Sequence, residues 1–189
     1  MTDLSMSDLL KCVGCGAILP ASDGPVHRYM DSSAACWATF NALNDPERPL
    51  EIAPFNALTV DAYAVQHPGV PSSQQAINSV AVHLMTLHGI LERDFKMDQA
   101  MWLRQRPGRP NLRLGRRPGS SDRHSRFHWL TPPSFANCLT VADVAAGETP
   151  QERSRLVKAW VLDVWKTWSE LHGAQVATWF EKFVISERF

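Results

Sequence analysis

Apolar residues recur at helical spacing in four stretches of the chain, and no convincing strand-like alternation accompanies them. The stretches are about 32–44, 59–67, 73–92 and 150–186. The first three begin at residues that can cap a helix, namely Ser32 or Ser33, Thr59, and Ser72 or Ser73. The last predicts one long helix or two consecutive ones, because Gly173 can break or kink it. The pattern predicts a mostly α-helical fold, a compact helical bundle with a cysteine-rich N-terminal loop.

The stretch 62–91 contains no Asp, Glu, Lys or Arg. It is interrupted by Pro68, Gly69 and several Ser, Gln and Asn residues, which is not the pattern of a membrane span. We therefore expect two helices that form a hairpin buried at the centre of the domain. His88 falls within the apolar face of the second helix and is expected to have a structural role.

Length and charge narrow the class of protein. The 189 residues carry 19 basic and 19 acidic side chains, and 44% of the residues are hydrophobic. This balance argues against a uniformly basic nucleic-acid binder and against a disordered chain, and the length predicts a single domain over 1–189. Four cysteines are too few for a disulfide scaffold. The first residues lack a signal-peptide pattern, so we expect a cytoplasmic protein without a membrane partner.

Two cysteines, Cys12 and Cys15, form a Cys-x-x-Cys-Gly motif whose thiolates can face one ion. His27 and Cys36 are the nearest further donors, and three Cys with one His suit zinc. The sequence thus predicts a zinc-binding loop region over 10–36. A thioredoxin-like redox pair lacks its helix context, and a disulfide is disfavoured in the cytoplasm. Cys36 could also be a small buried hydrophobe, and Cys138 is expected to be inert.

Several short runs resemble an uncharacterised family of small bacterial proteins, a domain of unknown function. The runs are Cys12–Ala17, Asp23–Met30, Cys36-Trp37, Thr59–Gly69 and Ser79–Leu84, with a fainter one at Leu139–Val144. The resemblance covers most of the chain except the Arg-rich stretch, and it supplies no reaction. It implies that six residues belong to one recurring pattern: Cys12, Cys15, His27, Cys36, His67 and His83.

The two arms of the predicted hairpin carry His67 and His83, with Tyr63 close by in sequence. In a metal-dependent enzyme these three residues could supply extra ligands, a general base or a contact to metal-bound water. They are our candidate catalytic residues. The alternative is that both histidines are buried and hydrogen-bonded to neighbouring polar groups, as any apolar hairpin could contain.

Two further regions could bind partners. Residues 104–126 contain eight Arg, and we expect a loop or insert over about 104–128. Arg side chains bind phosphates, so nucleic acid is a candidate partner, although a solvated loop is the simpler interpretation. Four tryptophans lie in the C-terminal helices: Trp160, Trp165, Trp168 and Trp179. Trp165 lies off their apolar face and could cover a neighbouring helix or a protein partner.

Three functions remain open. The first, which we prefer, is a metal-dependent enzyme that acts on a small molecule, with a zinc ion near His67 and His83. The second is a zinc-stapled module that binds nucleic acid through the Arg-rich stretch, and the third is a protein adaptor that uses the tryptophan-rich helices. Four protein ligands on the ion would favour the second or third function. An open coordination position facing Tyr63, His67 or His83 would favour the enzyme.

Overall fold

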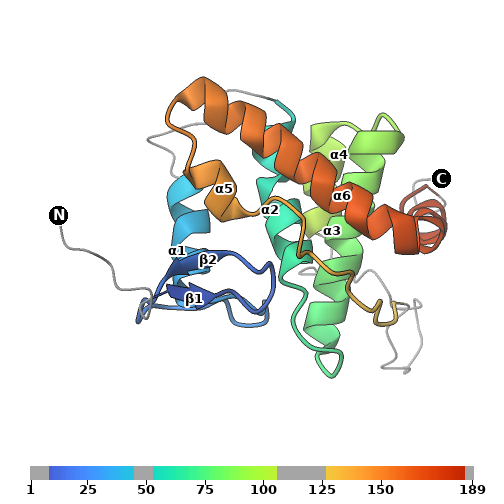
Figure 1. Ribbon diagram of the computed structural model, residues 1–189. Helices are drawn as coiled ribbons and strands as arrows, with labels where there is room; N and C mark the ends of the chain where they lie inside the picture. The colour runs from blue at the N-terminus through green and yellow to red at the C-terminus, as the bar shows by residue number, and fades with distance from the viewer. Residues whose placement is uncertain (1–8, 45–52, 106–126, 186–189) are drawn as a thin grey trace.

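The computed structural model describes residues 9–44, 53–105 and 127–185, and they form a mainly helical structure. The helices are α1 (Ala34–Leu43), α2 (Phe55–Gln66), α3 (Gln74–Glu92), α4 (Met97–Gln105), α5 (Val141–Ala145) and α6 (Pro150–Phe180), and a π-helical turn follows at Glu181–Ile185. Figure 1 shows α6 crossing α2 and α3 diagonally, with α1 and a small β-hairpin at one end. The predicted mostly α-helical fold is confirmed.

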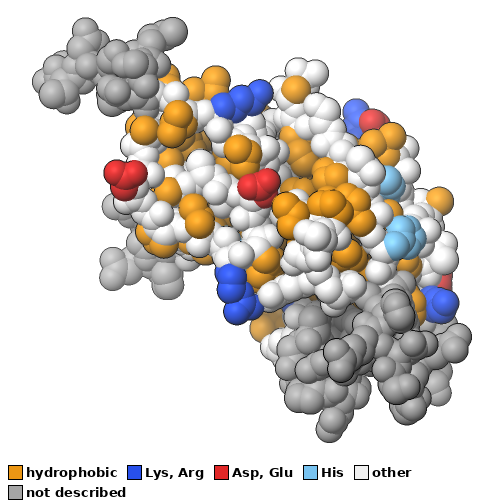
Figure 2. All heavy atoms as spheres, turned by 90° about the horizontal axis from the view of Figure 1, so that it is seen from below, with side chains coloured by type: hydrophobic (Ala, Val, Ile, Leu, Met, Phe, Trp, Pro, Cys, Tyr) orange, Lys and Arg blue, Asp and Glu red, His pale blue; other side chains and the backbone are white. Residues whose placement is uncertain are grey.

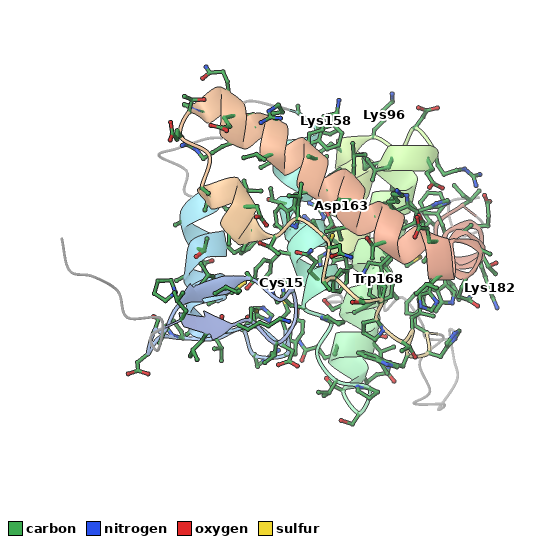
Figure 3. The ribbon with its side chains drawn as sticks, in the orientation of Figure 1. Cys15, Lys96, Lys158, Asp163, Trp168 and Lys182 are labelled. Carbon is green, nitrogen blue, oxygen red and sulfur yellow. The ribbon has the colours of Figure 1, made fainter. Side chains whose placement is uncertain are left out.

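The core lies where α2, α3 and α6 pack against one another. Helices α2 and α3 form the hairpin predicted from the uncharged stretch, and α6 covers both (Figure 1). The side chains of Trp160 and Trp168 are fully buried in this core. Their indole N–H groups donate to Gln66 Oε1 at 2.9 Å and to the Val65 carbonyl at 3.1 Å. Trp168, labelled in Figure 3, therefore ties α6 directly to the backbone of α2.

Helix starts follow the predicted caps with one exception. The hydroxyls of Ser33 and Ser73 accept hydrogen bonds from the backbone N–H groups of Cys36 and Ala76, each at 3.2 Å. The expected cap at Thr59 is wrong, because α2 already begins at Phe55. Thr59 is instead buried within α2 and donates to Asn44 Oδ1 at 2.7 Å. The extra turn places the fully buried Leu58 in the core, and this burial outweighs the missing side-chain cap.

Helix α6 runs without interruption through Gly173, so the C-terminal stretch is one long helix rather than two. A glycine inside a helix costs about 1 kcal/mol relative to alanine. Burial of Trp168, Val176 and Trp179 on both sides of Gly173 offsets that cost. Trp165 is also buried, and its indole donates to Glu92 Oε1 of α3 at 2.7 Å. It covers a neighbouring helix, which was one of its two expected roles.

The N-terminal region holds a short β-hairpin that the sequence analysis did not predict. Strands β1 (Leu9–Lys11) and β2 (Ile18–Pro20) pair antiparallel, with Leu10 opposite Leu19. Each strand has three residues, too few for an alternating pattern to stand out. Large hydrophobic side chains are exposed on and near this hairpin, among them Leu10, Val13, Ile18 and Val26. Figure 2, a view from below, shows hydrophobic side chains gathered in several groups on that face.

The Arg-rich stretch is described only at its two ends. Arg104 belongs to α4 and not to a loop, so the expected start of the loop at residue 104 is wrong. An ion pair with the buried Asp61 holds Arg104 in place. The other seven arginines, from Arg106 to Arg126, lie outside the described residues. Among the helices that the structure does describe, none is long and apolar enough to cross a membrane.

His88 is buried between Trp165 and Phe180, as its predicted structural role requires. Burial lowers the pKa of His88 below its usual value, although the nearby Glu92 carboxylate acts in the opposite direction. An unfolded histidine titrates near pH 6.5, so below that pH the unfolded chain binds more protons than the folded chain. His88 therefore contributes to acid destabilisation.

We expect the free energy of unfolding to fall as pH is lowered from about 7.5 through about 6.5. His88→Gln removes this titration and should make the decline shallower. Denaturant unfolding at several pH values, over a range in which metal content stays constant, measures the slope. Equal slopes for the variant and the wild type would contradict the role assigned to His88.

Candidate metal centre

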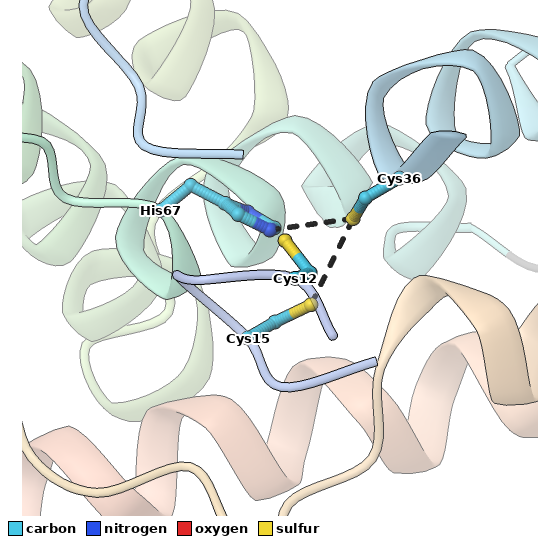
Figure 4. Close-up of side chains that lie close together, drawn as sticks. All are labelled: Cys12, Cys15, Cys36 and His67. Atoms are coloured by element: carbon cyan, nitrogen blue, oxygen red, sulfur yellow. Dashed lines mark hydrogen bonds between the residues drawn. The ribbon is translucent and has the colours of Figure 1, made fainter. Parts of the chain in front are cut away.

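Four buried side chains with metal-binding atoms meet at one point: Cys12, Cys15, Cys36 and His67. Their donor atoms all lie within 4.8 Å of one another, and the group could hold a metal ion. Figure 4 shows the three sulfur atoms and the imidazole pointing toward a common centre. The two cysteines of the motif lie in the turn after β1, while the other cysteine comes from α1 and the histidine from the end of α2.

The spacing of the donors fits a tetrahedral zinc site. Zinc–sulfur bonds of about 2.3 Å and zinc–nitrogen bonds of about 2.0–2.1 Å give S···S edges of about 3.8 Å and S···N edges of about 3.6 Å. The sulfur atoms of Cys15 and Cys36 are 3.7 Å apart. Cys36 Sγ lies 3.4 Å from His67 Nε2. These two distances are thus close to the edges of a tetrahedral zinc site.

A local hydrogen bond orients the imidazole of His67. Its Nδ1 lies 2.7 Å from the Tyr63 carbonyl oxygen, one helical turn earlier. A carbonyl can only accept, so Nδ1 carries the hydrogen and Nε2 presents its lone pair to the sulfur atoms. Metal-binding histidines commonly have such a partner on the other ring nitrogen. His67 is also the C-cap residue of α2, which is why the ring can reach back to that carbonyl.

Two of the sulfur atoms accept hydrogen bonds from neighbouring groups, which by themselves favour the thiolate form. The backbone N–H of Ser33 donates to Cys12 Sγ at 3.4 Å, and the Tyr63 hydroxyl donates to Cys36 Sγ at 3.7 Å. Cys36 also lies in the first turn of α1, where the partial positive charge of the helix N-terminus stabilises a thiolate. The ring of Tyr63 stacks on that of His67 with centroids 4.0 Å apart. Tyr63 therefore supports two of the four donors.

The turn that carries Cys12 and Cys15 depends on close backbone packing. Cys12 N–H donates to the Ala17 carbonyl at 2.8 Å, and Gly16, with φ of 81°, closes the turn. Gly14 lies directly against the imidazole of His67, and a Cβ atom at this position would come within 2.6 Å of His67 Cδ2. This close approach explains why residue 14 has no side chain and fixes the turn against the end of α2.

The thiols interact strongly with one another. Hydrogen bonds from Cys15 and Cys36 hold the pKa of Cys12 well below its usual value. The pKa of the Cys15 thiol lies far above its usual value, and the largest cause is the hydrogen bond between Cys15 and Cys12. The pKa of Cys36 rises to about 12, chiefly through its hydrogen bond to Cys12. Without a cation, one thiolate is thus held by two protonated neighbours, and metal binding would displace their protons.

The structure brings together three of the four predicted donors, but the fourth member of the group is His67 rather than His27. His27 packs edge-on against Tyr29 and Trp37, with ring centroids 4.5 and 5.0 Å apart. It lies on the segment between β2 and α1, whereas the C-terminal end of α2 brings His67 to the turn. Proximity in sequence to Cys15 was the signal that favoured His27.

The other candidate catalytic residue, His83, is not part of this group. Its Nδ1 lies 2.8 Å from Asp61 Oδ1, and the Asp61 carboxylate also forms an ion pair with Arg104. Sequence reasoning gave Asp61 no role and considered Arg104 only as a member of the Arg-rich stretch. A signal was present, since an acidic residue at a predicted helix start next to an uncharged stretch requires a partner when it is buried.

A hollow of about 370 Å³ borders the turn on its outer side. Its walls come from residues 11–16, the α2–α3 connection at Pro68 and Gly69, and the loop 132–136. Cys12 and Cys15 both line the hollow, although each residue is only 1% exposed. Little surface of these two residues is therefore open to a molecule bound there.

Cys138 lies apart from the four donors, and burial raises its pKa to about 12. At neutral pH its thiol is therefore protonated and a poor nucleophile, as expected of an inert cysteine.

Comparison with known proteins adds the family but no reaction. No curated protein and no solved structure matches the chain significantly. One family model matches residues 10–169, a range that contains all four donors together with Asp61, His83 and Arg104. The family is described as a family of unknown function, DUF5946. This agrees with the resemblance to an uncharacterised family noted above, and the chain belongs to that family.

Proposed function

We propose that the protein binds one zinc ion through Cys12, Cys15, Cys36 and His67, and that this ion is structural. Three thiolates and one imidazole form a soft, tetrahedral donor set, which is typical of structural zinc sites. The ion would join the turn after β1 to α1 and α2, three parts of the chain that are far apart in sequence. Its contribution would be to hold the N-terminal hairpin on the helical core.

One observation carries the structural role. The four donors come from the protein itself, and each residue is at most 1% exposed. Catalytic zinc sites keep one coordination position open for water or substrate, whereas structural sites are filled by four protein ligands. His67 and Tyr63, two of the candidate catalytic residues, are engaged with this donor set. These contacts support a structural ion over the metal-dependent enzyme that the sequence alone favoured.

Metal analysis of two histidine variants tests the ligand set. Protein purified without added metal should contain about one zinc ion per chain. His67→Gln should lose the ion because the amide is a poor ligand, while His27→Gln should retain it. The two substitutions are matched in chemistry and differ only in position. Retention of zinc by His67→Gln together with its loss from His27→Gln would contradict this ligand set and restore the one predicted from sequence.

The four tryptophans of α6 are at most 5% exposed, so their side chains offer little surface for a protein adaptor function. Nucleic-acid binding through the Arg-rich stretch remains a prediction, because residues 106–126 lie outside the described part of the chain.

A further inference from the structure

A second group of polar side chains lies on a different face of α2. Asp61 is fully buried and accepts hydrogen bonds from His83 Nδ1 at 2.8 Å and from Arg104 Nε at 3.1 Å, both at Oδ1. Its other oxygen accepts from Arg104 Nη2. Asp61 and Tyr63 are two residues apart, about 200° around the helix, so Asp61 points away from the metal centre. Helices α2, α3 and α4 each supply one member of this group.

The hydrogen bond to Asp61 determines which nitrogen of His83 is available. The carboxylate accepts from Nδ1, which therefore carries a hydrogen, so the neutral imidazole has its lone pair on Nε2. Arg104 pairs with the same carboxylate and balances its buried charge. Among the described residues, Asp61 is the only hydrogen-bond partner of the His83 side chain, which is 13% exposed. Nε2 is therefore a base held in place by a carboxylate.

A second histidine, His27, has an unsatisfied buried atom. Burial lowers the pKa of His27, and the charges of Arg28 and His83 lower it further. His27 Nδ1 is buried and has no hydrogen-bond partner among the described residues. An unsatisfied buried polar atom costs about 1–3 kcal/mol, and a polar ligand would recover that cost. Tyr29 and Trp37 pack edge-on against this ring.

We propose that Asp61, His83 and His27 form a proton-transfer site for a small uncharged molecule with a hydroxyl group, or for water. His83 Nε2 takes the hydroxyl proton, the O–H electron pair stays on the oxygen, and Asp61 stabilises the imidazolium that forms. Arg104 is already paired with the Asp61 carboxylate and the Ala57 carbonyl, so it offers no free charge to a carboxylate or phosphate, which favours an uncharged ligand. Asp61 is a positioning residue, and His27 supplies a second polar contact.

Hydrolysis of p-nitrophenyl acetate by the zinc-loaded protein tests the site without a known substrate. His83 would remove a proton from water, the water oxygen would bond to the acetyl carbon, and p-nitrophenolate would leave with the electron pair of the broken ester bond. We expect His83→Gln to lower the rate at least about tenfold, the low end for general-base catalysis. His172→Gln on α6 is the matched control and should leave the rate unchanged. The wild-type reaction should be slower in D₂O, because a proton moves in the rate-limiting step.

Variants of the neighbours separate positioning from folding. Asp61→Asn should also slow hydrolysis, and the double variant Asp61→Asn/Arg104→Gln removes the unpaired cation that the single change leaves behind. His27→Gln should raise KM and leave kcat unchanged. Metal content and thermal melting confirm that each variant is folded and loaded.

Equal rates for His83→Gln and the wild type would overturn the site. A rate lost in His83→Gln but insensitive to D₂O would make Nε2 a nucleophile and overturn the general-base role. An unchanged KM would remove His27 from the site.

Discussion

Replacing Cys15 with serine is expected to remove the metal ion and most of the stability of the protein. Cys15 is 1% exposed and lies among the other three donors, so the variant keeps a buried site with one weak ligand. Structural zinc in zinc-finger peptides contributes roughly 10–16 kcal/mol of apparent binding free energy at pH 7. Whole domains are stable by about 5–15 kcal/mol. Loss of the ion is therefore comparable with the total stability.

Metal analysis and circular dichroism of Cys15→Ser and Cys12→Ser measure this effect. Cys138→Ser is the matched control, because Cys138 lies apart from the four donors and is not expected to bind metal. The control should keep about one zinc ion per chain and an unfolding temperature close to that of the wild type. If Cys15→Ser retained zinc and melted like the control, a structural metal at this centre would be excluded.

The second large effect is expected at Gly14, which binds no metal itself. An added methyl group would meet the Asp31 carbonyl oxygen, His67 Cδ2 at 2.6 Å and the Gln66 carbonyl oxygen at 2.9 Å. Two of these atoms are backbone and cannot rotate away, so the turn or the imidazole must shift. Overpacking of this kind costs about 1–3 kcal/mol. Gly14→Ala should therefore weaken zinc binding by roughly 10- to 100-fold and lower the unfolding temperature.

Competition with a chelator gives the zinc affinity of Gly14→Ala, and a thermal melt gives its stability. Gly24→Ala is the control, because the atoms nearest to its added Cβ lie at 3.7 Å, an ordinary contact distance. We expect Gly24→Ala to match the wild type in both measurements. A Gly14→Ala protein with wild-type affinity would mean that the turn does not pack against His67 as described.

The features that sequence predicted well are local ones. Ser33 and Ser73 cap their helices within three residues, and the uncharged stretch forms its hairpin across a short connection. Cys12 and Cys15 lie in one turn, so their spacing alone indicates a pair of candidate metal ligands. Such features need no knowledge of how distant segments meet, which is why residue pattern and spacing were enough to find them.

The fourth donor and the Asp61 group depend on tertiary structure. His67 lies 31 residues beyond Cys36, and only the packing of α2 against the turn brings the two together. Arg104 is 43 residues beyond Asp61, and in sequence it reads as the first member of an Arg-rich loop. A buried carboxylate can select one arginine from such a run, but the sequence does not indicate which one. These contacts could not be derived from spacing.

The packing of α6 on the hairpin of α2 and α3 has a consequence for synthesis of the protein. Residues 12–67 contain all four proposed metal ligands, so the site can assemble early, while the ribosome is still adding later parts of the chain. The partners of α2 at Trp160 and Trp168 follow about a hundred residues later, since they are 94 and 103 positions beyond Gln66 and Val65. Until then the apolar surface of α2 and α3 is uncovered on the nascent chain. We expect the partly made chain to be most prone to aggregation during that interval, because this apolar surface is then exposed.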